Sequence, residues 1–145
     1  MGKRRQARIL ALQVMYQYDA GHRPTDEIFS SFWETQEETT AEVRHFVEEL
    51  VSGFLEHSEK IDLLIGDYSR HWEPERMAVV DRNILRLAIF ELLYREDIPP
   101  KVTINEFVDV AKKYSTEESG AFVNGILDRI FHEQGRAATQ ERGKA

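Results

Sequence analysis

Four cations and no acid stand among the first eight residues, in a chain whose formal net charge is −7. These cations are Lys3, Arg4, Arg5 and Arg8. An acidic body repels polyanions, so this segment, residues 3–8, which we call the basic tip, is where nucleic acid could dock. Arginines together with Gln6 can contact the phosphates and base edges of an unpaired strand. The alternative interpretation is a frayed terminus that only adds solubility.

The basic tip runs directly into the first predicted helix, which would hold its cations on a defined surface. Arg4 and Arg8 are one helical turn apart, so the spacing predicts that they lie in register. The positive end of the helix dipole adds to their charge. With about four phosphate contacts, the log–log salt slope for single-stranded RNA would be only about −3. Such a slope is weak for a protein that binds RNA alone, and it implies a partner.

Catalytic chemistry is not supported by the residue types. The five histidines lack the spacing of metal ligands. They are His22, His45, His57, His71 and His132. The nearest metal-like pair, His45 with Glu49, is interpreted as an ordinary surface pair. The chain has no cysteine, and no glycine-rich phosphate loop follows a strand. We therefore predict no catalytic residue, no metal site and no cofactor.

A second polar group, Asp81, Arg82 and Arg86, interrupts a long and very apolar predicted helix. Arg82 and Arg86 are one turn apart and could form an exposed edge that binds a partner. Equally, Arg86 could pair with a carboxylate such as Asp81 and close the edge of the bundle. The first helix is also largely apolar, and burial in the core is favoured over coverage by another protein. Tyr16 or Tyr18 could still reach the surface through its hydroxyl.

Apolar residues recur at helical spacing almost throughout, which predicts an all-α bundle of about seven helices without strands. Capping boxes mark three helix starts, at Thr39, Thr103 and Ser115. The first two predicted helices cover residues 4–20 and 26–36, and the third begins at the Thr39 box. The fourth and fifth cover 58–71 and 76–96. The sixth runs from the Thr103 box to about residue 114, and the seventh runs from the Ser115 box to a break at Gly135. The helix at 76–96 is apolar around most of its circumference, so we expect it to be central.

Length and composition favour one soluble globular domain, residues 1–134, followed by a disordered tail at 135–145. Of the 145 residues, 41% are hydrophobic and 31% are charged. The longest uninterrupted apolar runs are four residues, so no segment could span a membrane, and no signal peptide follows the basic tip. With no cysteine to oxidise, a cytoplasmic location is the simplest expectation.

Several stretches together resemble the NusB family of bacterial transcription antitermination factors. They occur in the family's order and span residues 4–131. They read RRQARILALQVMY at 4–16, LVSG at 50–53, DRNILRLAIFEL at 81–92, PPKVTINE at 99–106, VAKKY at 110–114 and FVNGILD at 122–128. No single stretch is decisive, but their joint occurrence is specific.

The resemblance implies a seven-helix bundle of two small subdomains. It also implies binding to single-stranded boxA-type RNA in ribosomal-RNA transcripts, together with NusE, a ribosomal small-subunit protein. This assembly would belong to an elongation complex that contains RNA polymerase and other Nus factors. The family's arginine-rich start corresponds to the basic tip, and its RNA edge to Glu118 with Phe122 beside it. Its partner contacts match Tyr16 and Asp81. Arg82 and Arg86 are candidates for partner binding from their spacing alone.

Two other functions stay open at this point. The chain could be a protein–protein scaffold without RNA contact, using the apolar first helix and the edge at 81–86. It could also be a fragment of a ribosomal-RNA methyltransferase, some of which carry a NusB-like domain, although no nucleotide-binding segment is present. A homodimer is possible, and the sequence does not decide it.

Overall fold

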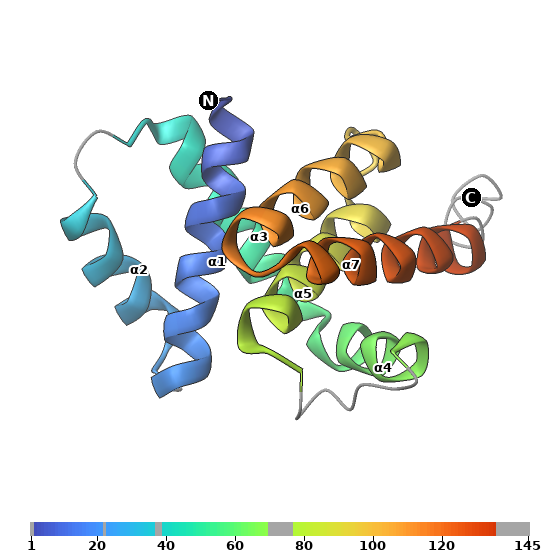
Figure 1. Ribbon diagram of the computed structural model, residues 1–145. Coiled ribbons are helices and arrows are strands. Elements are labelled where there is room, and N and C mark those ends of the chain that lie inside the picture. Colours follow the sequence, from blue (N-terminus) through green and yellow to red (C-terminus); the bar gives the residue numbers. More distant parts are fainter. Residues whose placement is uncertain (1, 22, 37–38, 70–76, 136–145) are drawn as a thin grey trace, which may run out of the picture.

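The computed structural model describes residues 2–21, 23–36, 39–69 and 77–135, which form seven α-helices and one π-helical turn (Figure 1). The helices are α1 (Lys3–Gly21), α2 (Thr25–Thr35), α3 (Ala41–Glu56), α4 (Ser58–Tyr68), α5 (Val79–Tyr94), α6 (Pro100–Tyr114) and α7 (Glu117–Ile130), and the π-helical turn η1 is Phe131–Gly135. The predicted all-α class and number of helices are confirmed. No strand occurs in these four described ranges.

Two groups of helices meet around α5. Helices α1, α2 and α3 form one group, and α4, α6 and α7 surround α5 to form the other (Figure 1). Helix α5 contacts α1, α3, α4, α6 and α7, and most of its side chains are buried. The prediction of a central helix is confirmed, because a helix that is apolar around its circumference must be covered on every side.

The helix starts of α3 and α7 are each one residue later than predicted. Thr40 rather than Thr39 caps α3, and Thr116 rather than Ser115 caps α7. In each case the threonine side chain accepts a hydrogen bond from the backbone N–H three residues further on. Adjacent hydroxyl residues satisfy the same sequence pattern, so only the backbone geometry decides which one caps the helix.

The predicted capping box of α6 is wrong. The helix begins at Pro100, with Pro99 as its N-cap, so Thr103 lies inside the helix. Proline fits the first turn because the N–H that it lacks would have no partner there. Thr103 is instead fully buried against the core. The pair Pro99–Pro100 therefore starts a helix here, rather than only ending what comes before it.

Helices α4 and α5 are shorter than predicted. Helix α4 ends at Tyr68 rather than at 71, and α5 runs from Val79 to Tyr94 rather than over 76–96. Helix α7 ends at Ile130, earlier than the break predicted at Gly135, and Gly135 is instead the last residue of the π-helical turn η1. The rest of the predicted tail, 136–145, lies outside the described residues. Across the part of the chain that is described, no helix has both the length and the apolar character needed to cross a membrane.

Gly53 allows α3 and α5 to approach closely. A Cβ atom built on Gly53 would lie 2.1 Å from Cζ of Phe90, far inside van der Waals contact. Phe90 is buried and stacks on Tyr94 with ring centroids 5.6 Å apart. The ring is therefore held on more than one side, and it has little room to yield.

We expect Gly53→Ala to lower the free energy of unfolding by about 2 kcal/mol, because the methyl group overpacks the contact with Phe90. Gly66→Ala in α4 is the matched control, since no atom lies within 4 Å of its added Cβ. That variant should gain about 0.5 kcal/mol from helix propensity. Urea unfolding followed by circular dichroism measures both, and a Gly53→Ala variant as stable as Gly66→Ala would contradict the packing.

Candidate nucleic-acid interface

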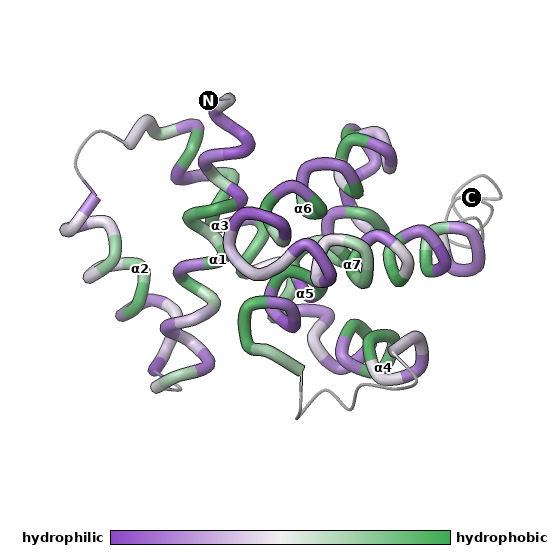
Figure 2. The backbone as a smooth tube through the Cα atoms, viewed as in Figure 1, coloured by the Kyte–Doolittle hydropathy of each residue, from purple (hydrophilic) through white to green (hydrophobic). Residues whose placement is uncertain are grey.

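The basic tip occupies the first two turns of α1, at the end of the molecule marked N (Figure 2). The side chains of Lys3, Arg4 and Gln6 are exposed, and that of Arg5 is half-buried. The cations are thus fixed on an ordered helix, as predicted, rather than on a frayed end. The first turn of α3 and helix α6 lie beside them, because Lys3 pairs with Glu42 and Arg5 with Glu106.

Arg8 is the exception, and the prediction that it shares a surface with Arg4 is wrong. Its side chain is 2% exposed and forms a two-pronged ion pair with Glu91, which is 0% exposed. Nε lies 2.9 Å from Oε1 of Glu91, and Nη2 lies 3.1 Å from Oε2. The guanidinium also lies over the rings of Phe46 and Phe107, at 5.5 and 5.7 Å from their centroids. Arg8 therefore joins α1 to α3, α5 and α6 and has almost no contact with solvent.

Position 8 points inward because it continues the apolar side of α1, on which Ala7, Ala11 and Met15 are also buried. Glu91, its partner, is a residue that the sequence analysis missed. A signal was present: Glu91 stands alone inside an apolar run of the most apolar helix. A charge in that position needs a buried cation, because an unpaired buried carboxylate is very unfavourable.

The remaining cations of the basic tip are already paired with carboxylates. Arg5 donates from Nε to Glu106 at 2.6 Å and from Nη2 to Asp109 at 2.8 Å. Those hydrogen bonds to Glu106 and Asp109 raise the pKa of Arg5 above its ordinary value. Its charge is therefore held firmly, but much of it is neutralised by α6.

Lys3 and Arg4 are paired more loosely. Lys3 lies 3.2 Å from Glu42, and Arg4 lies 3.7 Å from Asp97, with all four side chains more than half exposed. A hydrogen bond from Arg95 lowers the pKa of Asp97 below its ordinary value, so this acid stays ionised. We call the carboxylates around the basic tip the acidic collar. Its members are Glu42, Asp97, Glu106 and Asp109.

A hollow of about 370 Å³ opens between the basic tip and the start of α6. It is lined by Gly2, Arg4, Arg5, Arg8, Ile98, Pro99, Val102 and Glu106. One wall thus presents guanidinium groups, which suit phosphate, and the other presents apolar side chains, which suit a sugar or a base. This combination is the chemistry expected of a contact with an unpaired strand.

The structure brings Glu118 and Phe122 together with Asp81, in a hollow whose lining includes no residue of the basic tip. All three line a hollow of about 230 Å³ between the starts of α5 and α7. Asp81 is only 8% exposed and accepts a hydrogen bond from the Ser119 hydroxyl at 2.9 Å. Glu118 is exposed, and Phe122 is half-buried against the core. The predicted RNA edge and one predicted partner contact are therefore neighbours.

The open question over Arg82 and Arg86 is resolved in favour of ion pairing, but not with Asp81. Arg86 binds Asp62 through Nε and Nη2, at 2.9 and 3.1 Å, and binds Asp19 at 3.1 Å. Arg82 contacts the other oxygen of Asp19 at 2.9 Å. The predicted exposed edge is thus a mostly buried network that ties α1 and α4 to α5.

Asp19 is the centre of that network. Burial alone would raise its pKa, but hydrogen bonds from Arg82 and Asn83 and the charge of Arg86 outweigh burial and lower the pKa. Asp19 therefore remains ionised, and it orders both arginines. Neither Asp19 nor Asp62 was predicted, since each lies more than 20 residues from its arginine along the chain.

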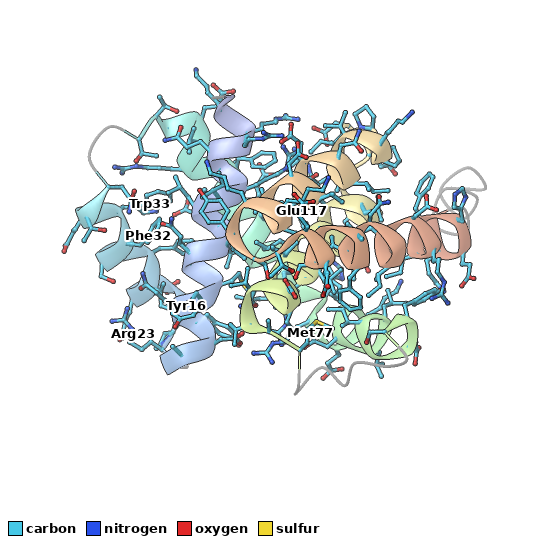
Figure 3. The ribbon with its side chains drawn as sticks, viewed as in Figure 1. Tyr16, Arg23, Phe32, Trp33, Met77 and Glu117 are labelled. Carbon is cyan, nitrogen blue, oxygen red and sulfur yellow. The ribbon has the colours of Figure 1, made fainter. Side chains whose placement is uncertain are left out.

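Tyr16 is the residue of α1 that departs from burial. It is 58% exposed, although Val14 and Met15 beside it are fully buried. The prediction that α1 is buried in the core is confirmed. Tyr16 is the tyrosine of α1 that reaches the surface, as one of the two tyrosines was expected to do. Figure 3 shows Tyr16 on the half of α1 that lies away from the basic tip. A partner that touched Tyr16 would leave the basic tip open.

Comparisons with known proteins agree on one family. The NusB family profile matches residues 5–132. The transcription antitermination protein NusB of Thermodesulfovibrio yellowstonii is 46% identical over 141 residues, covering 91% of this chain and 93% of its own. That of Myxococcus xanthus is 47% identical over 133 residues, covering 90% and 95%.

Solved structures of NusB proteins have the same fold. A structure of NusB from T. maritima superposes with a TM-score of 0.84 at 35% identity, covering 97% of this chain and 98% of that one. A crystal structure of antitermination factors NusB and NusE in complex with double-stranded RNA superposes with a TM-score of 0.80 at 31% identity, covering 91% and 98%.

We expect Arg8→Ala to lower the free energy of unfolding by about 4 kcal/mol, because it leaves the buried Glu91 carboxylate without a partner. The double variant Arg8→Met with Glu91→Leu should recover most of that loss, since it removes both charges and keeps the volume. Arg4→Ala, an exposed position on the same helix, should change stability by less than about 0.5 kcal/mol. Urea unfolding of the three variants checks this, and equal stabilities of Arg8→Ala and Arg4→Ala would contradict a structural role for Arg8.

Proposed function

The chain belongs to the NusB family, and we propose that it is an RNA-binding transcription antitermination factor rather than an enzyme. The relatives that match nearly its whole length carry the name transcription antitermination protein NusB. The single observation that carries a role in RNA binding is the ordered basic tip beside a hollow of about 370 Å³ with one cationic and one apolar wall.

The proposed ligand is single-stranded boxA-type RNA in ribosomal-RNA transcripts. Lys3, Arg4 and Arg5 would contact phosphates, and Gln6 would contact a base edge. Arg8 would not contact RNA itself, because its guanidinium is buried. It would support binding by holding α1, and with it the other cations, in a fixed position. Phosphates would have to displace the acidic collar, so we expect modest affinity for RNA without a partner.

The proposed protein partner is NusE, within a cytoplasmic elongation complex that contains RNA polymerase and other Nus factors. A NusB structure of the same fold binds NusE and RNA together, which supports a ternary complex here. Tyr16 offers an exposed aromatic ring for the partner. The hollow at Asp81, Glu118 and Phe122 would lie where RNA and NusE meet, and Arg82 and Arg86 would hold that face rigid.

We expect Arg4→Glu with Arg5→Glu to weaken binding of boxA RNA about a hundredfold, since two phosphate contacts become two repulsions. Helix content and binding to NusE should not change. Arg23→Glu with Lys60→Glu, just before α2 and on α4, is the control with the same change of charge. Gel shifts with and without NusE measure the effect.

Gel shifts of the unmodified chain distinguish an RNA-binding factor from a protein–protein scaffold. A scaffold would give no sequence-dependent shift of boxA RNA in either lane, which would refute RNA binding. Retained RNA binding by the Arg4→Glu, Arg5→Glu variant would refute the basic tip as the contact.

We expect Glu106→Gln with Asp109→Asn to strengthen RNA binding about tenfold, because Arg5 is then free of its two carboxylates. The log–log salt slope should become steeper, since salt no longer helps to release Arg5 from α6. Glu56→Gln with Glu59→Gln, at exposed positions of α3 and α4, removes the same two charges elsewhere. Fluorescence anisotropy across a salt series compares the two, and equal gains would show that only net charge matters.

A further inference from the structure

We propose that the outer face of α6 extends the RNA-binding surface beyond the basic tip. We call this face the α6 track, and it consists of Lys101, Asn105, Val108 and Lys112. The proposal rests on the function proposed above and concerns the path of the same RNA strand. It assigns α6 a direct role, whereas the sequence analysis placed no site on that helix.

The α6 track carries positive charge that no carboxylate of the described residues neutralises. Each cation of the basic tip already has a carboxylate partner. Lys101 and Lys112 are exposed, and within the described residues neither forms an ion pair. A phosphate that approaches either lysine therefore displaces no carboxylate, so the attraction is not reduced by competition.

The residues of the α6 track share one side of the helix. The spacings from Lys101 to Asn105, Val108 and Lys112 are four, seven and eleven residues, so these residues lie along one side of the helix. Eleven residues of α-helix rise about 16 Å, which separates the two lysines by roughly that distance. Such a row suits an extended strand, in which two phosphates that are not adjacent can each meet one lysine.

A groove lies beside this row of residues. A hollow of about 540 Å³ lies between α6 and α7. It is lined by Asn105, Val108, Asp109, Lys112, Glu117, Gly120, Ala121 and Asn124. The amides of Asn105 and Asn124 each offer donors and an acceptor, as base edges require. The lining is thus polar and amide-rich, which fits an unpaired base better than an apolar side chain of a protein.

Gly120 places Lys112 in this groove. A Cβ on Gly120 would lie 2.5 Å from Cγ of Lys112 and 3.1 Å from its Cε, so the aliphatic chain crosses α7 where no side chain intervenes. Of the two acids in the groove, Asp109 is bound to Arg5. The other, Glu117 (Figure 3), stands in the first turn of α7, where it complements the positive end of the helix dipole.

Asp109 also makes the groove continuous with the basic tip. It belongs to the lining of the groove and binds Arg5, which lines the hollow at the start of α6. A strand anchored at Arg4 and Arg5 can thus continue along α6 from the first hollow into the second. The geometry assigns phosphates to Lys101 and Lys112 and a base to the amide pair.

The test is binding of a fluorescein-labelled single-stranded RNA that carries boxA, measured by anisotropy with and without NusE. Lys101→Gln with Lys112→Gln should bind about tenfold more weakly, and its log–log salt slope should be shallower by about 1.4, which is two phosphate contacts. Lys101→Arg with Lys112→Arg should keep the original affinity. Arg23→Gln with Lys60→Gln, a pair of cations just before α2 and on α4, should also match the unmodified chain.

Each other result overturns the proposal in a distinguishable way. A Lys101→Gln, Lys112→Gln variant that binds like the unmodified chain, or no worse than the Arg23→Gln, Lys60→Gln control, refutes the α6 track while the proposed function stands. A variant that loses NusE in the absence of RNA makes α6 a protein contact instead. If the unmodified chain binds no RNA in either condition, the proposed function fails, and the α6 track fails with it.

Discussion

The buried ion pair between Arg8 and Glu91 is the contact on which the arrangement of this surface depends. It joins α1 to the central helix α5, and the rings of Phe46 and Phe107 enclose the guanidinium from α3 and α6. Two charges without access to water tolerate little change in geometry, because each would be very unfavourable alone. Arg8 is thus buried and not available at the surface. Because it fixes the start of α1, the preceding cations, Lys3, Arg4 and Arg5, lie on an ordered helix.

Charge around the basic tip is closely balanced. The acidic collar neutralises Lys3, Arg4 and Arg5, and a net charge of −7 repels polyanions at longer range. Such a surface discriminates against arbitrary nucleic acid, because electrostatic attraction is small until a strand makes base contacts as well. A protein partner that adds contacts to the same strand would raise the affinity, so RNA would be bound mainly when that partner is present. The proposed weak binding of RNA by the isolated chain and its selective binding in a complex would then have the same cause.

The sequence was sufficient for the number and order of the helices, though not for each of their ends, because apolar residues at i, i+3 and i+4 leave no other element for these segments. It failed where the answer depends on partners distant along the chain. Arg4 and Arg8 are the same residue type one turn apart, yet Arg8 finds Glu91 and Arg4 stays exposed. Arg86 was expected to pair with a nearby acid, but Asp19 and Asp62 reach it from other helices.

The central claim is that RNA lies on the ordered start of α1 and along α6, held in place through Arg8 and Glu91. The most direct measurement is photocrosslinking of boxA RNA that contains 4-thiouridine to the chain bound to NusE, with the crosslinked peptides identified by mass spectrometry. The account predicts crosslinks within residues 2–8 and 100–114. Crosslinks confined to α2 or α4, with both of these segments unmodified, would contradict it.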